Sequence, residues 1–258
     1  MPQTSRPFRL ALLVTATLAS ALLSACGSSG STSASTTTPA GTPTATATPT
    51  PTPSPTPRQP PTAAQLKQAL LALPDLPTGF EVETSEAGNG DSNEDGDAIA
   101  SSTDAKCAPL VKLNNAGDLK GSVANANASF SGGKDGPFIS EDLEAMPSAA
   151  AAATVMKQVA AAVVACRKLT LRIQGVGRST MRVSHVSAPA LGDEVFAIRY
   201  TATSGVMAGF ELNEVLVRVG DVLTVMDYLL ADPDVIEGAT TDAVAKVQKT
   251  LGAGATSA

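Results

Sequence analysis

The sequence predicts an α+β fold: a mostly antiparallel sheet covered by two or three helices, forming a single domain after a disordered tether. Three observations predict it. Short segments in which apolar and polar residues alternate recur through the second half of the chain, as in half-buried strands. Two longer segments carry apolar residues at helical spacing. Runs of strands stand beside separated helices, which favours an antiparallel sheet over a parallel one.

Residues 1–25 have the organisation of an export signal. Arg6 and Arg9 form a basic start, and an apolar run over residues 10–23 follows. As a helix this run would reach about 21 Å, short of the roughly 30 Å hydrocarbon core of a membrane. We therefore expect a removable signal peptide and not a permanent spanning helix.

The end of the signal reads Leu23-Ser24-Ala25-Cys26-Gly27 and resembles the bacterial lipobox. This resemblance implies that the Cys26 thiol receives diacylglycerol and becomes the mature N-terminus. Two or three acyl chains anchor a protein stably, whereas one binds only marginally. We expect a lipid anchor on the extracytoplasmic face of the cell membrane. The alternative is an ordinary secretory signal with an incidental cysteine.

The charge of the chain argues against some partners. Loss of Arg6 and Arg9 with the signal would change the formal net charge from −6 to −8. An acidic exported protein is a poor match for nucleic acid or for anionic lipid headgroups. We expect no nucleic-acid partner, and membrane association only through the lipid anchor.

Residues 26–61 are expected to form a disordered tether behind the lipidated cysteine. They are almost wholly Ser, Thr, Pro, Ala and Gly, with Arg58 as the only charged residue. Such a composition has nothing to bury. Alternating Thr and Pro favours polyproline II, at about 3.1 Å per residue, so the segment is suited to span a cell wall. O-glycosylation of these Ser and Thr residues is a further hypothesis.

Residues 62–254 have a globular composition and are long enough for one domain. Thr62 caps an amphipathic helix over residues 62–73, which Pro74 ends. The remaining expected elements are strands over 79–84, 123–131, 138–146, 169–176, 180–186, 194–203, 209–219 and 221–229, and helices over 148–169 and 242–251. The long Ala-rich helix has an apolar stripe made of Ala152, Val155, Val159, Ala162, Val163 and Cys166.

Beyond the lipobox, Cys107 and Cys166 are the remaining cysteines. An even pair in an exported domain predicts a disulfide between them. It would join the acidic loop expected over residues 85–105 to the end of the long helix. The alternative is two buried free thiols.

Residues 91–97 match the first half of an EF-hand calcium loop. Asp91, Asn93 and Asp95 occupy loop positions 1, 3 and 5, which supply calcium ligands. Gly96 stands at position 6, where an EF-hand loop has glycine, and Asp97 follows it. The twelfth position is Ser102 and not a bidentate Glu. A solvated acidic loop is the favoured interpretation, with weak calcium binding as the alternative.

No enzyme is expected. His185 is the sole histidine, and no hydrolase, metalloprotease or nucleotide-binding motif accompanies it. An ordinary sheet histidine is favoured over a catalytic one. Too few Cys and His residues are present for a typical zinc site, and no cofactor is expected. The absence of Trp argues against carbohydrate binding by stacking.

Three short segments resemble one family: LLALPDLPTGF (70–80), LGDEV (191–195) and VRVGDVL (217–223). They are similar to the actinobacterial lipoproteins that share the extracellular sensor domain of the PknH serine/threonine kinase. This resemblance spans about residues 62–252. It implies a mixed sheet and helix domain with a cleft for an unidentified ligand, and no catalysis. Family members often carry two disulfides, whereas this chain can form one.

The sequence therefore predicts a lipid-anchored, sensor-like domain that binds an unknown small ligand or an envelope protein. With no kinase segment present, sensing would pass to a partner. A second hypothesis is a carrier of lipid or glycolipid across the cell envelope. Its cavity would be lined by residues such as Val155, Val159, Ile198 and Leu216. A hydrolase with an unrecognised site ranks last.

Overall fold

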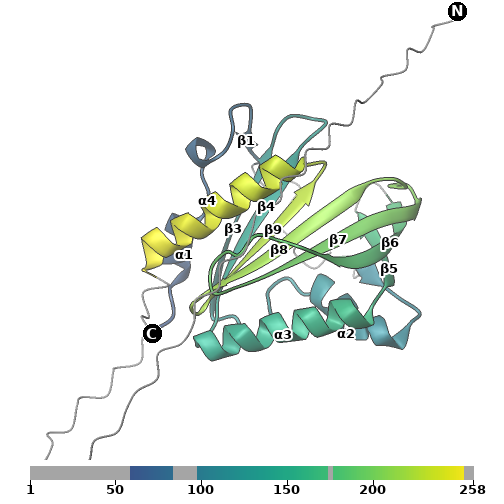
Figure 1. The fold of residues 1–258 in the computed structure, drawn as a ribbon, viewed down its shortest axis with the longest axis horizontal. Helices are drawn as coiled ribbons and strands as arrows, with labels where there is room; N and C mark the ends of the chain where they lie inside the picture. The colour runs from purple at the N-terminus through teal and green to yellow at the C-terminus, as the bar shows by residue number, and fades with distance from the viewer. Residues whose placement is uncertain (1–58, 84–97, 174–176, 253–258) are drawn as a thin grey trace, which may run out of the picture. The chain divides into compact units, whose positions relative to one another are not determined.

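A nine-stranded sheet lies at the centre of the computed structural model, which describes residues 59–83, 98–173 and 177–252. Every pair of neighbouring strands is antiparallel, in the order β1-β3-β4-β9-β8-β7-β6-β5-β2 (Figure 1). The strands are β1 (Glu81–Val82), β2 (Ala100–Ser101), β3 (Ala124–Ser131), β4 (Phe138–Ala145), β5 (Lys168–Ile173), β6 (Gly177–Val186), β7 (Glu194–Gly205), β8 (Glu211–Val219) and β9 (Val222–Leu229). The α-helices are α1 (Ala63–Ala69), α2 (Ala108–Asn114), α3 (Ala149–Ala165) and α4 (Pro233–Leu251).

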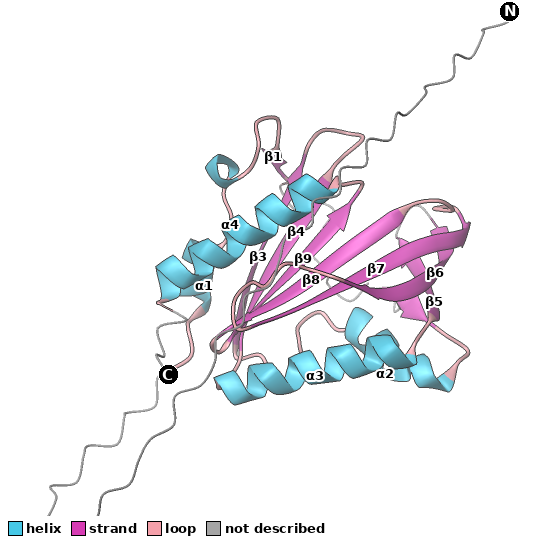
Figure 2. Cartoon of the chain, viewed as in Figure 1, coloured by secondary structure: helices cyan, strands magenta, loops and turns pink. Residues whose placement is uncertain are grey.

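Helices cover both faces of this sheet (Figure 2). One face packs against α1 and α4, around core residues such as Leu66, Leu143 and Val247. The other packs against α2 and α3, around residues such as Leu110 and Met156. Successive side chains of a strand point to opposite faces, so the central strands contribute to both cores. The expected antiparallel α+β fold is confirmed.

The helices differ from expectation in number and length. The described residues form four α-helices, not two or three, because α2 was not expected. The first helix ends at Ala69, since the backbone of Leu70 turns extended with ψ 151°. The last helix begins at Pro233, well before residue 242, because burial of Ala239 and Ala243 against the sheet outweighs the weak helix propensity of its first half.

The long helix α3 is confirmed, and its local sequence explains its bounds. Ser148 caps the first turn by accepting a hydrogen bond from the Ala151 N–H at 3.2 Å. The six residues of the expected apolar stripe are all buried. The helix ends before Cys166, whose backbone is extended. Burial of the stripe fixes α3 along its whole length on the sheet.

The predicted disulfide between Cys107 and Cys166 is confirmed. Cys107 immediately precedes α2, and Cys166 immediately follows α3. Both cysteines are buried. A helix as short as α2 is marginal by itself, so the cross-link to the end of α3 fixes where it starts.

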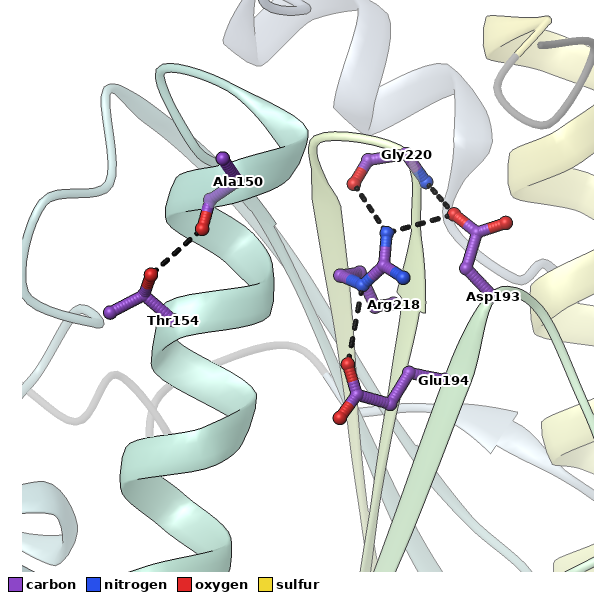
Figure 3. Close-up of polar contacts among 6 residues, drawn as sticks. All are labelled: Ala150, Thr154, Asp193, Glu194, Arg218 and Gly220. Atoms are coloured by element: carbon purple, nitrogen blue, oxygen red, sulfur yellow. Dashed lines mark hydrogen bonds and ion pairs between the residues drawn. The ribbon is translucent and has the colours of Figure 1, made fainter.

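Arg218 joins the start of β7 to the turn between β8 and β9 (Figure 3). Its guanidinium donates to Asp193 at 3.0 Å, contacts Glu194 at 3.5 Å, and donates to the Gly220 carbonyl at 3.4 Å. Asp193 also accepts from the Gly220 N–H at 2.7 Å. We call these four residues the Arg218 clasp. They come from two of the family-like segments, so these motifs have a structural role.

Gly192 is required beside the clasp. Its φ is +59°, and an added Cβ would lie 2.5 Å from the Arg218 carbonyl oxygen. Only a residue without a side chain fits at position 192.

Figure 3 also draws a bond within α3. The Thr154 hydroxyl donates to the Ala150 carbonyl at 2.8 Å, a local bond of the kind Thr makes in helices.

Replacing Cys107 and Cys166 together by Ala should destabilise the domain by roughly 4 kcal/mol, because the cross-link closes a long loop in the unfolded chain. The two cysteines are 59 residues apart. Urea unfolding followed by circular dichroism measures the change. Reductant should shift the unfolding midpoint of the parent chain and leave that of the double variant unchanged. Equal midpoints for parent and variant would contradict the prediction.

The substitution Gly192→Ala should cost about 2–5 kcal/mol, since it combines left-handed backbone strain with a backbone collision. Gly252→Ala is the matched control. Gly252 has the same φ of +59°, but an added Cβ meets no atom within 4 Å. The control should cost only about 1–2 kcal/mol. Equal losses in urea unfolding would show that the collision does not matter.

Candidate functional site

A cavity of about 380 Å³ lies between α2 and the sheet face that α2 and α3 cover. Its polar lining comes mainly from adjacent strands. The polar side chains are Asn114, Asp142, Glu144, Arg172, Tyr200, Glu214 and Asp227. Its apolar lining includes Leu110, Leu113, Leu119, Leu212, Leu216 and Val225. Four carboxyl groups therefore share one small space, which we call the acidic cavity.

Strand register brings these carboxyl groups together. Glu214 on β8 lies directly opposite Asp227 on β9, and such pairs have Cβ atoms about 4.5–5.5 Å apart. Asp142 on β4 pairs with Val225, so it is diagonal to Asp227, a separation of about 7–8 Å. Glu144 follows on the same face of β4. The carboxyl groups thus form a line across three neighbouring strands.

A chain of hydrogen bonds reaches Glu214 from α2. The Asn114 side-chain amide donates to the Tyr200 hydroxyl at 3.5 Å, and this hydroxyl donates to Glu214 at 3.1 Å. Asn114 also donates to the Leu110 carbonyl within α2 at 3.0 Å. The position of Glu214 is therefore tied to that of α2.

Two of the carboxyl groups lack full hydrogen bonding within the described part of the chain. The Leu119 N–H donates to Oε1 of Glu144 at 3.3 Å, while Oε2 has no partner there. Glu144 is only 3% exposed. No hydrogen bond from the described residues reaches the Asp227 carboxyl. Buried polar groups are normally paired, so such atoms need an explanation.

Burial raises the pKa of every carboxyl group in the acidic cavity. It raises the pKa of Glu214 to about 7, although the hydrogen bond from the Tyr200 hydroxyl lowers that pKa in part. The pKa of Asp227 is raised well above its ordinary value, first by burial and then by the Glu214 charge. Burial also raises the pKa of Asp142 to about 6 and raises that of Glu144. The Glu214 charge thus disfavours ionisation of Asp227, its neighbour across the two strands.

Another buried carboxyl group, Glu141, lies on the opposite sheet face. It accepts from the Leu71 N–H at 2.6 Å, just beyond α1. Burial raises its pKa to about 7, although that bond and the Lys246 charge oppose the shift. This residue ties α1 to β4 and does not line the acidic cavity.

The chemistry of the acidic cavity is that of a cation or proton site. Carboxylates attract cations strongly where water is largely excluded. Among the described residues, no group of three or more Cys, His, Asp or Glu side chains is arranged to hold a metal ion.

Several expected site residues lie outside the described ranges. They are Cys26 and the loop residues Asp91, Asn93, Asp95 and Asp97. The lipid anchor and the calcium loop therefore stay predictions. Over the residues that the structure does describe, no helix is both long and apolar enough to cross a membrane.

His185 does not take part in the acidic cavity. It is exposed on β6, and its ring stacks on Phe196 with centroids 4.6 Å apart. No hydrogen bond joins it to another described residue. This position is that of an ordinary sheet histidine.

The residues proposed for a lipid cavity are all buried in the core cluster between α3 and the sheet. Val155 and Val159 belong to α3, and Ile198 and Leu216 to the sheet. Val159 and Leu216 reach the acidic cavity, whereas Val155 lines an outer groove. Ile198 is fully buried. They do not enclose a common dry space within the described residues.

Sequence reasoning did not identify the acidic cavity. In strands with alternating polarity, Asp142 and Asp227 have the pattern of solvent-facing positions. One signal was available: the Gly220-Asp221 turn places Glu214 and Asp227 at matching distances on either side of it. That symmetry predicts a cross-strand pair of like charges, which is unfavourable on an ordinary surface.

The fold is similar to that of a known extracellular domain. The crystal structure of the extracellular domain of PknH from Mycobacterium tuberculosis matches with a TM-score of 0.53 at 13% sequence identity. The match covers 74% of this chain and 98% of that one. No family model and no curated protein matches the sequence significantly. The chain therefore has a PknH-like fold.

Stability should fall as pH rises from 5 to 8. A raised pKa means that the folded state binds its proton more tightly than the unfolded state does. The resulting stabilisation is complete below the unfolded value, 4.5 for Glu141, and is lost as pH passes the folded value of about 7. That shift corresponds to about 3 kcal/mol.

Thermal melting followed by circular dichroism across this pH range measures the effect. Glu141→Gln should make the decline smaller, because the amide stays neutral and its oxygen can still accept from Leu71; the acids of the acidic cavity should keep the rest of it. The control Glu237→Gln changes an exposed residue of α4 and should leave the decline unchanged. A melting temperature that is constant or rises with pH would refute the prediction.

Proposed function

We propose that this chain is a lipid-anchored, extracytoplasmic and non-catalytic domain that captures a small ligand in the acidic cavity. The observation that carries the proposal is a partly enclosed cavity in which Oε2 of the buried Glu144 has no hydrogen-bond partner among the described residues, and the half-buried Asp227 carboxyl accepts no hydrogen bond from them. A merely structural cavity would gain stability from apolar residues at these positions. A bound ligand can donate the hydrogen bonds that these carboxyl groups do not receive from the described residues.

Three observations support an extracytoplasmic location. The chain starts with a signal-like segment. A disulfide joins Cys107 and Cys166, as is common in oxidising compartments. The fold is similar to that of a domain described as extracellular. In this proposal Cys26 carries the lipid, and residues 27–61 extend the domain away from the membrane.

A sensor domain must pass the effect of ligand binding to another protein. In this proposal the ligand-bound domain acts on an envelope protein. α2 is the element best placed to respond, because it covers the cavity and reaches Glu214 through Asn114 and Tyr200.

A carrier of lipid or glycolipid is the alternative, and one observation favours it. A groove of about 860 Å³ between α2 and α3 has apolar walls that include Met146, Val155 and Ala162, and it is also lined by Lys112 and Lys120. These features suit an acyl chain with an anionic headgroup. The acidic cavity does not suit such a ligand, because carboxyl groups repel it.

Replacing the lipidation residue should release the protein. In a bacterial host that processes lipoproteins, the parent chain should fractionate with membranes, and Cys26→Ser should appear in the soluble or secreted fraction. Quantitative immunoblotting of both fractions measures this. The control Cys107→Ser should stay with membranes. Equal membrane association of Cys26→Ser and the parent would rule out the anchor.

Native mass spectrometry tests capture. The full Cys26→Ser chain, purified from its host, should carry a non-covalent adduct of small mass. The adduct should disappear in a variant that adds Glu214→Gln and Asp227→Asn. A lipid mass that persists in this variant would support the carrier instead. No adduct in either protein, at any declustering energy, would count against capture.

A further inference from the structure

We infer that the acidic cavity takes an aliphatic polyamine, a flexible organic cation whose ammonium groups are separated by short methylene spacers. The inference rests on the proposed function and names the chemical class of its ligand. Three features of the cavity support it: the spacing of the carboxyl groups, the apolar surface between them, and their unused hydrogen-bonding capacity.

The carboxyl groups are spaced for a chain of cations. Glu214 and Asp227 face each other across β8 and β9, and Asp142 follows diagonally on β4. Glu144 lies two residues further along β4, about 7 Å away. In a sheet, the Cβ atoms of residues in this register lie about 5–8 Å apart in succession, which is comparable to the distances between amino groups joined by short alkyl spacers. One extended polyamine can therefore meet several carboxylates in turn.

Apolar side chains fill the space between these acids. Leu216 and Val225 lie on the sheet floor, while Leu110 and Leu113 come from α2. Methylene spacers bury well against such surfaces, at about 25 cal/mol per Å² of apolar area. A ligand that alternates cationic and apolar groups thus matches a cavity that alternates acidic and apolar groups.

The cavity has hydrogen-bond acceptors to spare. Oε2 of Glu144 is buried without a partner among the described residues, and the Asp227 carboxyl receives no hydrogen bond from them. An ammonium group offers up to three donors, whereas carboxylates only accept. Arg172 on β5 is the cationic side chain of the described lining. The four acids outnumber this one Arg, so the cavity has negative charge for a ligand to neutralise once they are ionised.

A single metal ion fits this arrangement less well. Calcium draws its oxygen ligands to about 2.3–2.6 Å around one point. Here the acids are distributed along three strands, and those on β8 and β4 are separated by β9. An elongated cation reaches all of them without deforming the sheet.

Polyamine binding must compete with protons. Asp142 and Glu144 on β4, Glu214 on β8 and Asp227 on β9 face the ligand, with Tyr200 on β7 and Arg172 on β5 as the other charged or titratable groups of the lining. Asp118, in the segment after α2, also raises the pKa of Asp142 and Glu144. The raised pKa values favour protons at pH 5. Spermidine should therefore bind more tightly at pH 8 and release protons.

Isothermal titration calorimetry with spermidine tests the inference, using the full Cys26→Ser chain. Putrescine, magnesium chloride and calcium chloride are the comparison ligands. A double variant with Glu214→Gln and Asp227→Asn should bind spermidine on the order of tenfold more weakly or worse. The matched control is Asp234→Asn with Glu237→Gln, which makes the same charge change on exposed α4 positions. Its affinity should equal that of the parent.

The outcomes separate the inference from the proposed function. Saturable spermidine binding that is lost only in the cavity variant supports both, provided that circular dichroism shows this variant folded. Equal affinity in both variants means non-specific attraction and overturns the inference. Calcium or magnesium binding that is lost in the cavity variant, without spermidine binding, also overturns it but keeps the proposed function. No spermidine binding together with no adduct in native mass spectrometry overturns both.

Discussion

The register of the β8–β9 hairpin determines most of what is specific to this domain. Val219 pairs with Val222 across a two-residue turn, in which Gly220 has a φ of +62°. This register sets Glu214 opposite Asp227 on the face covered by α2 and α3. A slip of β9 by one residue would turn Asp227 to the other face, away from Glu214. The Arg218 clasp holds the turn in place, so residues that resemble family motifs support the cavity without touching it.

The cover of the cavity depends on a different constraint. α2 is short, and the Cys107–Cys166 disulfide fixes its start against the end of α3. Asn114 at its other end reaches Glu214 through Tyr200. Carboxyl groups that would be solvated on an open sheet are thereby partly or fully buried, which raises their pKa values. Covalent, packing and electrostatic constraints meet at this one helix.

Much of the fold could be predicted from the sequence, because strand alternation and helical stripes are local patterns. The stripe of α3 and the disulfide were predicted correctly. α2 was not, since its seven residues hold only one pair of large apolar residues at helical spacing, Leu110 and Leu113, and so short a helix depends on its cross-link. The start of α4 was missed because burial outweighs propensity there.

The candidate site was harder to predict, because burial of an acid is a tertiary property. Asp142 and Asp227 have the alternation of exposed strand residues, and only α2 and α3 turn that face into an interior. The expected lipid-cavity residues were apolar and proved to be core, whereas the residues lining the cavity that we propose for binding are acids. Sequence periodicity locates the face of a strand, but it does not say what covers it.

The central claim is that Glu214 and Asp227 form a half-buried acid pair in which the pKa of each carboxyl group is raised. A carbon-13 NMR titration of their side-chain carboxyl groups tests it most directly, with Glu214→Gln and Asp227→Asn used for assignment. The account predicts that Glu214 titrates near 7 and Asp227 well above its ordinary value. Independent titration of both groups at the ordinary values of exposed acids, about 4, would contradict it.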